Sequence, residues 1–203
     1  FLAWLEREGF EYDLYAETQF HEETLNLDEY KVLITTTHPE YWSRHMYYTL
    51  KSWVFERGGR LMYLGGNGLN CEVEFPDEYT MKVNNGNVLA LDRPGEGIES
   101  RFHIYNESEA NLLGVVYDDR GIMTAGPYQV VDCSHWVFEG TSLVTGDLFG
   151  INCQHQRIPG GASGHETDKI SASSPDNTQL LAQGQNPDEG GAEMVLHEPM
   201  EGA

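Results

Sequence analysis

A histidine and a glutamate two residues apart, His38 and Glu40, follow directly after an apolar segment at residues 31–36. The segment is rich in β-branched residues, as is typical of a buried parallel strand. Pro39 disfavours helix at His38 and suits a helix start, so the strand ends sharply. Open α/β sheets bind ligands beyond such strand ends, where this pair can bind a metal or move protons. The alternative is a carboxylate favoured by the helix dipole beside a histidine bonded to the backbone.

A second polar residue, Asn67, follows the next apolar segment at residues 60–64. Apolar residues at helical spacing predict a helix between the two strands, ending near Arg57. Strand, helix and strand of this length form a right-handed crossover with parallel strands. If the strands are neighbours, about 4.8 Å apart, His38, Glu40 and Asn67 converge on one crevice. The glycines around Asn67 allow close approach of a ligand, or simply a tight turn with Asn67 at positive φ.

The pattern as a whole predicts an α/β fold: part of a doubly wound parallel sheet, followed by a β-rich and loop-rich second half. Residues 1–70 read as the α/β crossover part, with a helix at 1–8 and a strand at 10–15. Residues 71–150 read as a β-rich insertion, and residues 151–203 as a polar loop with final strands that rejoin the α/β domain. Expected strands of the second half are 72–75, 80–83, 88–91 (after a hairpin turn at 84–87), 113–117, 128–131, 136–138, 178–182 and 193–197.

Charge and cysteine content narrow the class of protein. The 203 residues carry a net charge of −21, from 33 acidic and 12 basic side chains. This charge repels phosphate backbones and anionic lipid, so we expect neither nucleic acid nor a membrane surface as a partner. Three cysteines without a Cys-x-x-Cys pair indicate reduced thiols and a cytoplasmic protein. Because the chain opens inside a helical pattern, we expect it to be a piece of a longer protein.

A polar loop at residues 164–168 supplies one more candidate, Glu166. Glu166 can act as a general base near the crevice or belong to a solvated turn, and spacing does not separate these readings. His165 in this loop and the nearby Cys153 and His155 lack zinc spacing, although an oxygen-rich site for a hard cation stays open. No Gly-x-Ser-x-Gly elbow is present, which argues against a serine hydrolase.

Residues 38–43 and 57–68 resemble the C-terminal region of the N,N-dimethylformamidase large (beta) subunit. Residues 160–168 and 181–188 are similar to the same family, whereas the middle of the chain matches only loosely. The resemblance implies a fold like the class I glutamine amidotransferases, in which Asn67 occupies the turn that carries their cysteine. Thiol chemistry would then be absent.

The resemblance also implies an activity, hydrolysis of N,N-dimethylformamide or a similar small linear amide to amine and formate. The family uses a mononuclear non-haem iron (Fe³⁺) held by two tyrosines and a glutamate. Glu40 matches the glutamate, and the tyrosines are expected upstream, so the site would be incomplete in this chain. His38 and Asn67 match pocket residues, and Glu166 is the candidate for a second carboxylate. A small helical subunit and homo-oligomerisation are implied as well.

Two other hypotheses stay open at this point. The chain can be a non-catalytic α/β module with a degenerate pocket, serving in carbohydrate binding or assembly. It can also be a related enzyme for a different small amide. Formate release from dimethylformamide separates all three, and iron content separates catalysis from the non-catalytic module.

Overall fold

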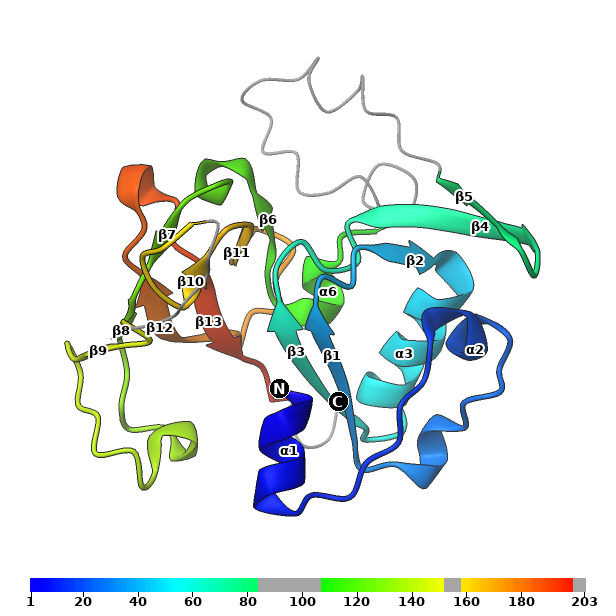
Figure 1. The fold of residues 1–203 in the computed structure, drawn as a ribbon, viewed down its shortest axis with the longest axis horizontal. Coiled ribbons are helices and arrows are strands. Elements are labelled where there is room, and N and C mark those ends of the chain that lie inside the picture. The colour runs from blue at the N-terminus through cyan, green and yellow to red at the C-terminus, as the bar shows by residue number, and fades with distance from the viewer. Residues whose placement is uncertain (84–106, 152–157, 199–203) are drawn as a thin grey trace.

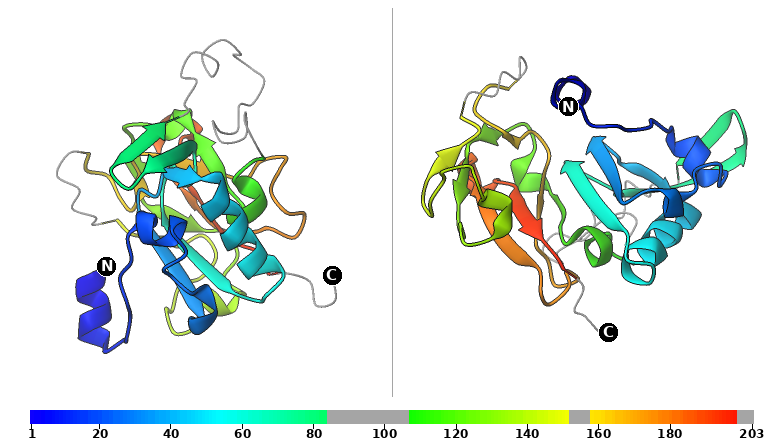
Figure 2. Two further views of the ribbon diagram at one scale, coloured as in Figure 1. Left: turned by 90° about the vertical axis from the view of Figure 1, so that its right-hand side faces the viewer. Right: turned by 90° about the horizontal axis from the view of Figure 1, so that it is seen from below.

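The computed structural model describes residues 1–83, 107–151 and 158–198, which form two parts lying side by side (Figure 1). The first part combines helices with parallel strands, and the second is built from short strands and turns (Figure 2). Within the described residues, no helix has the length and apolar character that crossing a membrane requires.

Two parallel strands joined by a helix form the centre of the first part. β1 (Val32–Thr37) pairs with β3 (Arg60–Gly65) in parallel, and α3 (Arg44–Phe55) connects them. The predicted crossover is therefore confirmed. In the register of this pair Thr37 lies opposite Gly65, so the residues that follow each strand leave from the same edge.

The helix begins later than the sequence predicts. Ser43 is its N-cap, and the Ser43 hydroxyl accepts a hydrogen bond of 3.2 Å from the backbone N–H of Met46. Residues 41–43 instead form β2 (Tyr41–Ser43), which pairs in parallel with β4 (Cys71–Asp77). β5 (Thr80–Val83) pairs with β4 in the antiparallel direction and completes this second small sheet.

The main core lies where α3 faces the strands and the preceding turns. Leu33 and Leu61, from the two parallel strands, pack against the buried face of the helix. Short helices α2 (Glu17–His21) and η1 (Leu27–Glu29) close the other side. The spacing of apolar residues at positions 42–54 thus predicts correctly which face of α3 is buried. The buried members of this core are Phe20, Leu25, Leu27, Trp42, Met46, Tyr47, Leu50, Trp53, Leu69 and Leu112.

The second part is organised around an antiparallel sheet of four strands, in the order β13-β12-β8-β9. The predicted strands at 178–182 and 193–197 are confirmed as neighbours in this sheet, whereas residues 136–138 form a 3₁₀ turn rather than a strand. The elements of this part are α6 (Ala110–Leu113), β6 (Val116–Asp118), η2 (Asp119–Gly121), β7 (Ala125–Gly126), β8 (Tyr128–Val130), η3 (Trp136–Phe138), β9 (Leu148–Phe149), β10 (Ser163–Gly164), β11 (Thr167–Lys169), β12 (Gln179–Gly184), η4 (Pro187–Glu189) and β13 (Glu193–Leu196).

The predicted doubly wound sheet, and with it the expected class I glutamine amidotransferase-like fold, is wrong for the described residues. β1 and β3 form a two-stranded sheet of their own, and the remaining strands belong to several separate small sheets. Residues 10–15, the predicted third strand, are extended but join no sheet, and α1 (Leu2–Glu8) buries only Leu5. The chain is therefore β-rich. The expected hairpin at 84–87 and strand at 88–91 lie outside the described residues.

Candidate active site

The candidate site lies at the edge where β1 and β3 both end. The positive φ of Thr37, 68°, turns the chain at the end of β1, and His38 and Glu40 follow before β2 begins. Glu166 reaches the same edge from the second part, directly before β11. The structure thus brings together three residues that the sequence analysis singled out.

The imidazole of His38 lies between two carboxylates. Its Nδ1 is 3.5 Å from Oε2 of Glu40, and its Nε2 forms an ion-pair contact with Oε2 of Glu166. The His38 side chain is 43% exposed, whereas those of Glu40 and Glu166 are 12% and 25% exposed. A half-exposed imidazole flanked by half-buried carboxylates can take up, hold and release a proton at the solvent boundary.

Glu40 is fixed by the start of β4 as well as by His38. The Cys71 thiol donates a hydrogen bond of 3.1 Å to Oε1 of Glu40, and the Cys71 backbone N–H donates one of 2.9 Å to the Glu40 carbonyl oxygen. Cys71 is fully buried. Its thiol also bonds to a candidate site residue, a role that sequence spacing did not reveal.

Asn67 lies in the turn after β3, buried and in the left-handed region with φ of 57°. This is the conformation expected for an asparagine in a tight turn. Its side-chain Oδ1 is buried, and within the described residues it has no hydrogen-bond partner. No described hydrogen bond joins Asn67 to His38, Glu40 or Glu166. The Asn67 backbone N–H instead donates to Asp168, a neighbour of Glu166 in the chain.

Two residues of this site, Tyr63 and Asp168, were missed by the sequence analysis. The Tyr63 hydroxyl donates to Oδ2 of Asp168 at 2.5 Å, and the Asn67 backbone N–H donates to Oδ1 of Asp168 at 2.9 Å. Burial raises the pKa of Asp168 to about 6, although hydrogen bonds from Tyr63 and the turn oppose this. Burial, reinforced by Asp168, raises the pKa of Tyr63 well above its ordinary value. Strand alternation places Asp168 on the same face as Glu166, but β11 is too short for this pattern to be recognised in the sequence.

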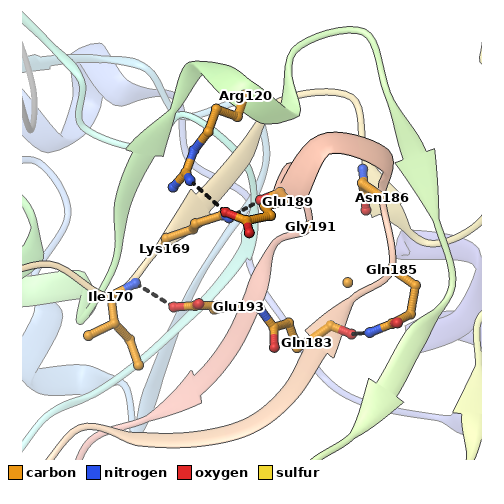
Figure 3. A pocket seen from close by; sticks show the side chains of 10 residues that line it. Arg120, Lys169, Ile170, Gln183, Gln185, Asn186, Glu189, Gly191 and Glu193 are labelled. Carbon is orange, nitrogen blue, oxygen red and sulfur yellow. Dashed lines mark hydrogen bonds and ion pairs between the residues drawn. The ribbon is translucent and has the colours of Figure 1, made fainter. Parts of the chain in front are cut away.

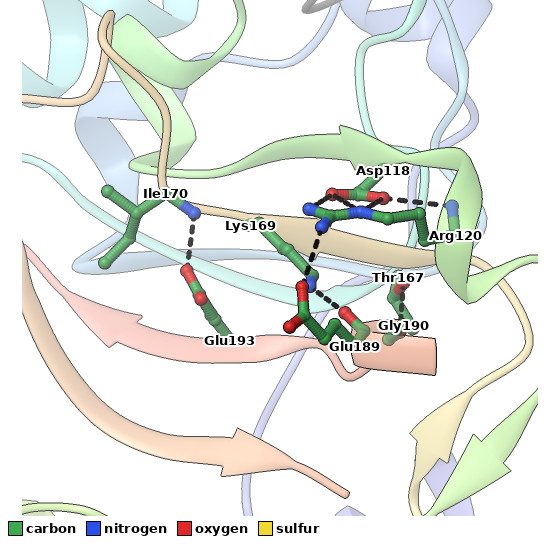
Figure 4. Close-up of polar contacts among 8 residues, drawn as sticks. All are labelled: Asp118, Arg120, Thr167, Lys169, Ile170, Glu189, Gly190 and Glu193. Atoms are coloured by element: carbon green, nitrogen blue, oxygen red, sulfur yellow. Dashed lines mark hydrogen bonds and ion pairs between the residues drawn. The ribbon is translucent and has the colours of Figure 1, made fainter. Parts of the chain in front are cut away.

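The opposite face of β11 contacts a polar cavity of about 580 Å³, which Figure 3 shows from close by. The two positively charged side chains that line the cavity, Arg120 and Lys169, both bind oxygen atoms of the protein itself. Arg120 forms an ion pair with Asp118 and one of 3.3 Å with Glu189, and the Lys169 ammonium donates to the Glu189 carbonyl oxygen (Figure 4). Burial would raise the pKa of Asp118, but hydrogen bonds from Arg120 bring it below its usual range. Through Lys169, this side of the cavity connects β11 to η4.

Glu40 fits the role of one metal ligand, since a half-buried carboxylate is a hard oxygen donor suited to ferric iron. A complete set is not present in the ranges 1–83, 107–151 and 158–198, which contain no group of three or more His, Cys, Asp or Glu side chains able to hold a metal ion. Cys153 and His155 lie outside these ranges. The described residues thus offer one candidate ligand, Glu40, and not a complete set.

A histidine held between two carboxylates at a strand end has the geometry that general acid–base chemistry uses. Over residues 1–203 the chain matches the family described as N,N-dimethylformamidase beta subunit-like, C-terminal. The chain belongs to this family, which confirms the resemblance seen in the sequence.

Two relatives carry the name N,N-dimethylformamidase beta subunit. The protein from Alcaligenes sp is 30% identical over 206 residues, and that from Paracoccus aminophilus is 29% identical over 206 residues. Each alignment covers 89% of this chain and 26% of the relative. The chain therefore spans about a quarter of the length of these relatives.

Proposed function

We propose that this chain supplies acid–base residues to the active site of a hydrolase that cleaves N,N-dimethylformamide or a similar small linear amide. The family membership and the names of the two relatives support this class of reaction. The observation that carries the proposal is the contact of both His38 ring nitrogens with carboxylates, those of Glu40 and Glu166. Since the relatives are longer, the activity is proposed for the protein to which this segment belongs.

The role proposed for His38 and Glu166 is proton transfer. Hydrolysis adds water to the carbonyl carbon and breaks the carbon–nitrogen bond, and the departing nitrogen must gain a proton. His38 delivers that proton from Nε2, and Glu166 then passes to His38 the proton that it takes from the attacking water. The half-exposed imidazole next to half-buried Glu166 supports this assignment.

Glu40 is the proposed iron ligand. Bound ferric iron would polarise the amide carbonyl and lower the pKa of water, and its remaining ligands would come from outside this chain. The Cys71 thiol and His38 hold the two carboxylate oxygens of Glu40 in a fixed orientation, which suits a pre-arranged ligand.

Asn67 is the proposed hydrogen-bond donor to the oxygen that becomes negatively charged. The Asn67 side-chain amide is buried in the turn after β3, and its N–H group is the proposed donor. Removal of one such donor costs about 10²–10³ in kcat in comparable sites.

The proposed setting is a multi-subunit cytoplasmic enzyme. The relatives are named beta subunits, which supports assembly with a second type of subunit. Cys71 and Cys133 form no disulfide within the described residues, which supports a reducing compartment.

The first experiment assays the full-length protein, with its partner subunit, for formate and dimethylamine. His38→Gln and Glu166→Gln should each lower kcat about 10²–10⁴-fold, the size of a general acid–base contribution. His45→Gln and Glu78→Gln, two exposed positions away from the site, serve as matched controls and should retain activity. Unchanged kcat in both site variants would refute the proton-transfer role.

A second experiment measures iron in the Glu40→Ala variant of the same protein. Loss of iron together with activity is expected, because the variant removes an oxygen ligand. Retained iron would remove Glu40 as a ligand. A wild-type protein with neither iron nor formate release would instead support a non-catalytic binding or assembly module.

A further inference from the structure

β11 divides its side chains between two faces, as the alternation of a strand requires. On one face the Thr167 hydroxyl donates to the Gly190 carbonyl oxygen at 2.8 Å, and Lys169 donates to the carbonyl oxygen of Glu189. On the other face Glu166 contacts His38, and Asp168 receives hydrogen bonds from the end of the β1–β3 pair. One strand therefore joins the antiparallel hairpin of the second part to the candidate site.

Asp168, Tyr63 and the turn after β3 form a closed group of three hydrogen bonds. The Tyr63 hydroxyl and the Asn67 backbone N–H both donate to the Asp168 carboxylate. The Gly68 backbone N–H donates to the Tyr63 hydroxyl oxygen at 2.7 Å. Asp168 and Asn67 are buried, so the bond between them is shielded from water, and the two bonds of the Tyr63 hydroxyl are partly buried.

The same contact sets the position of Glu166. A Cβ atom added to Gly66 would lie 2.2 Å from the Glu166 carbonyl oxygen, so backbone meets backbone at this point. Glu166 is only two residues from Asp168, and Asn67 is one residue from Gly66. The bond from Asp168 to the Asn67 backbone therefore helps to hold this turn beside the backbone of Glu166.

We infer that Asp168 and Tyr63 are positioning residues for the reaction, because they hold the backbone of the turn that carries Asn67 against the segment that carries Glu166, across the contact between the two parts. Neither needs to touch the substrate. The inference rests on the proposed function, since it assigns Asn67 and Glu166 to one active site. It predicts that loss of the Asp168 carboxylate lowers the rate of the chemical step more than the affinity for substrate.

The test uses the full-length enzyme with its partner subunit, in wild type, Asp168→Ala, Asp168→Asn and Tyr63→Phe forms. Steady-state kinetics with dimethylformamide give kcat and KM, and hydrogen exchange followed by mass spectrometry reports the amides of peptides covering residues 66–69. Asp119→Asn and Tyr79→Phe are matched controls at exposed positions. Thermal unfolding shows that each variant is folded.

We expect Asp168→Ala to lower kcat about 10–100-fold, as loss of a supporting hydrogen bond does at other sites, with KM changed less than about threefold. Exchange at residues 66–69 should become about tenfold faster. Asp168→Asn keeps an acceptor for the Asn67 N–H and should recover part of both losses. Tyr63→Phe should shift both readouts in the same direction, and the controls should match wild type.

Folded variants with wild-type kcat, or with a lower kcat but unchanged exchange at residues 66–69, would overturn the inference. If Asp168→Ala does not fold, Tyr63→Phe decides by the same two readouts. A wild-type enzyme that releases no formate would refute the proposed function instead. The exchange data would then still show whether Asp168 holds the turn.

Discussion

The Asp168 carboxyl group is buried, and its ionisation should make the free energy of unfolding depend on pH. Its pKa is about 6 in the folded protein, against an ordinary 3.8. The folded protein therefore binds this proton more tightly than the unfolded chain, so the Asp168 contribution to the free energy of unfolding falls as pH rises from about 4 to above 6.

Asp168→Asn removes this titration. We expect the free energy of unfolding of wild type minus that of Asp168→Asn to fall by about 1 kcal/mol between pH 5 and pH 7.5, where the raised pKa loses its effect. Urea unfolding at a series of pH values measures the difference, and Asp119→Asn is the control at an exposed carboxylate. A difference that is constant or grows with pH would contradict the assignment.

Cys71 offers a second test at the residue scale, because its buried thiol donates to the proposed ligand Glu40. Cys71→Ala removes that donor and should weaken iron binding about 10–100-fold, whereas Cys71→Ser keeps a donor and should weaken it less. Iron retained after dialysis against a chelator is the measurement. Cys133→Ala, at a second cysteine away from Glu40, is the control. Equal iron retention in Cys71→Ala and wild type would exclude a role for the thiol.

At the scale of elements, the sequence predicts well where a repeating pattern is long enough to be read. The 12 residues of α3 show a full apolar period, and the strands on either side must then be parallel. The pairings β6–β11 and β7–β10 escape prediction, because strands of two or three residues are too short to show alternation. The expected doubly wound sheet failed for a related reason. Strand type can be read locally, but strand order depends on contacts that the pattern does not encode.

The candidate site divides in the same way. His38 and Glu40 stand out from their position between strand and helix, and Glu166 was a candidate from its polar loop and from the family resemblance. Tyr63 reads as an ordinary strand aromatic, and its partner Asp168 lies 105 positions away in the chain. A hydrogen bond across that separation leaves no mark on local composition. It could be recognised only once β11 was placed against the turn after β3.

The contact between β11 and this turn can be tested with one methyl group. In Gly66→Ala the added Cβ would overlap the Glu166 carbonyl oxygen, so β11 or the turn must move. We expect a loss of about 1–3 kcal/mol in the free energy of unfolding together with a clear fall in kcat. Chemical unfolding and steady-state kinetics measure the two effects.

Gly58→Ala is the control that separates the loss of stability from the fall in kcat. Gly58 has φ of 74° and open space around an added Cβ, so alanine there should cost about 1 kcal/mol through backbone strain alone. Its kcat should match wild type. If Gly66→Ala also kept wild-type kcat despite the loss of stability, the position of Glu166 would not matter for catalysis.

At the scale of the whole molecule, the net charge of −21 on 203 residues is the dominant electrostatic feature. With 33 acidic and 12 basic side chains, the ion pairs cannot neutralise most of the acids. Several exposed pairs are present, among them Lys82 with Glu74 and Arg57 with Asp28. Exposed pairs contribute only about 0–1 kcal/mol each. Repulsion among the acidic side chains in the folded state should therefore exceed the contribution of these pairs. This repulsion opposes folding.

Salt should consequently stabilise this chain. Raising NaCl from 0.02 M to 0.3 M shortens the screening length to below about 8 Å, which weakens repulsion among exposed acids more than it weakens a few close pairs. We expect the free energy of urea unfolding of the 203-residue chain at pH 7.5 to rise by about 1 kcal/mol or more over this range and then level off. Sucrose, which acts through exclusion from the surface, gives a steady rise without levelling and serves as the control. A fall in stability with NaCl would mean that the ion pairs, including those that hold β11 beside the site, outweigh the repulsion among the acidic side chains.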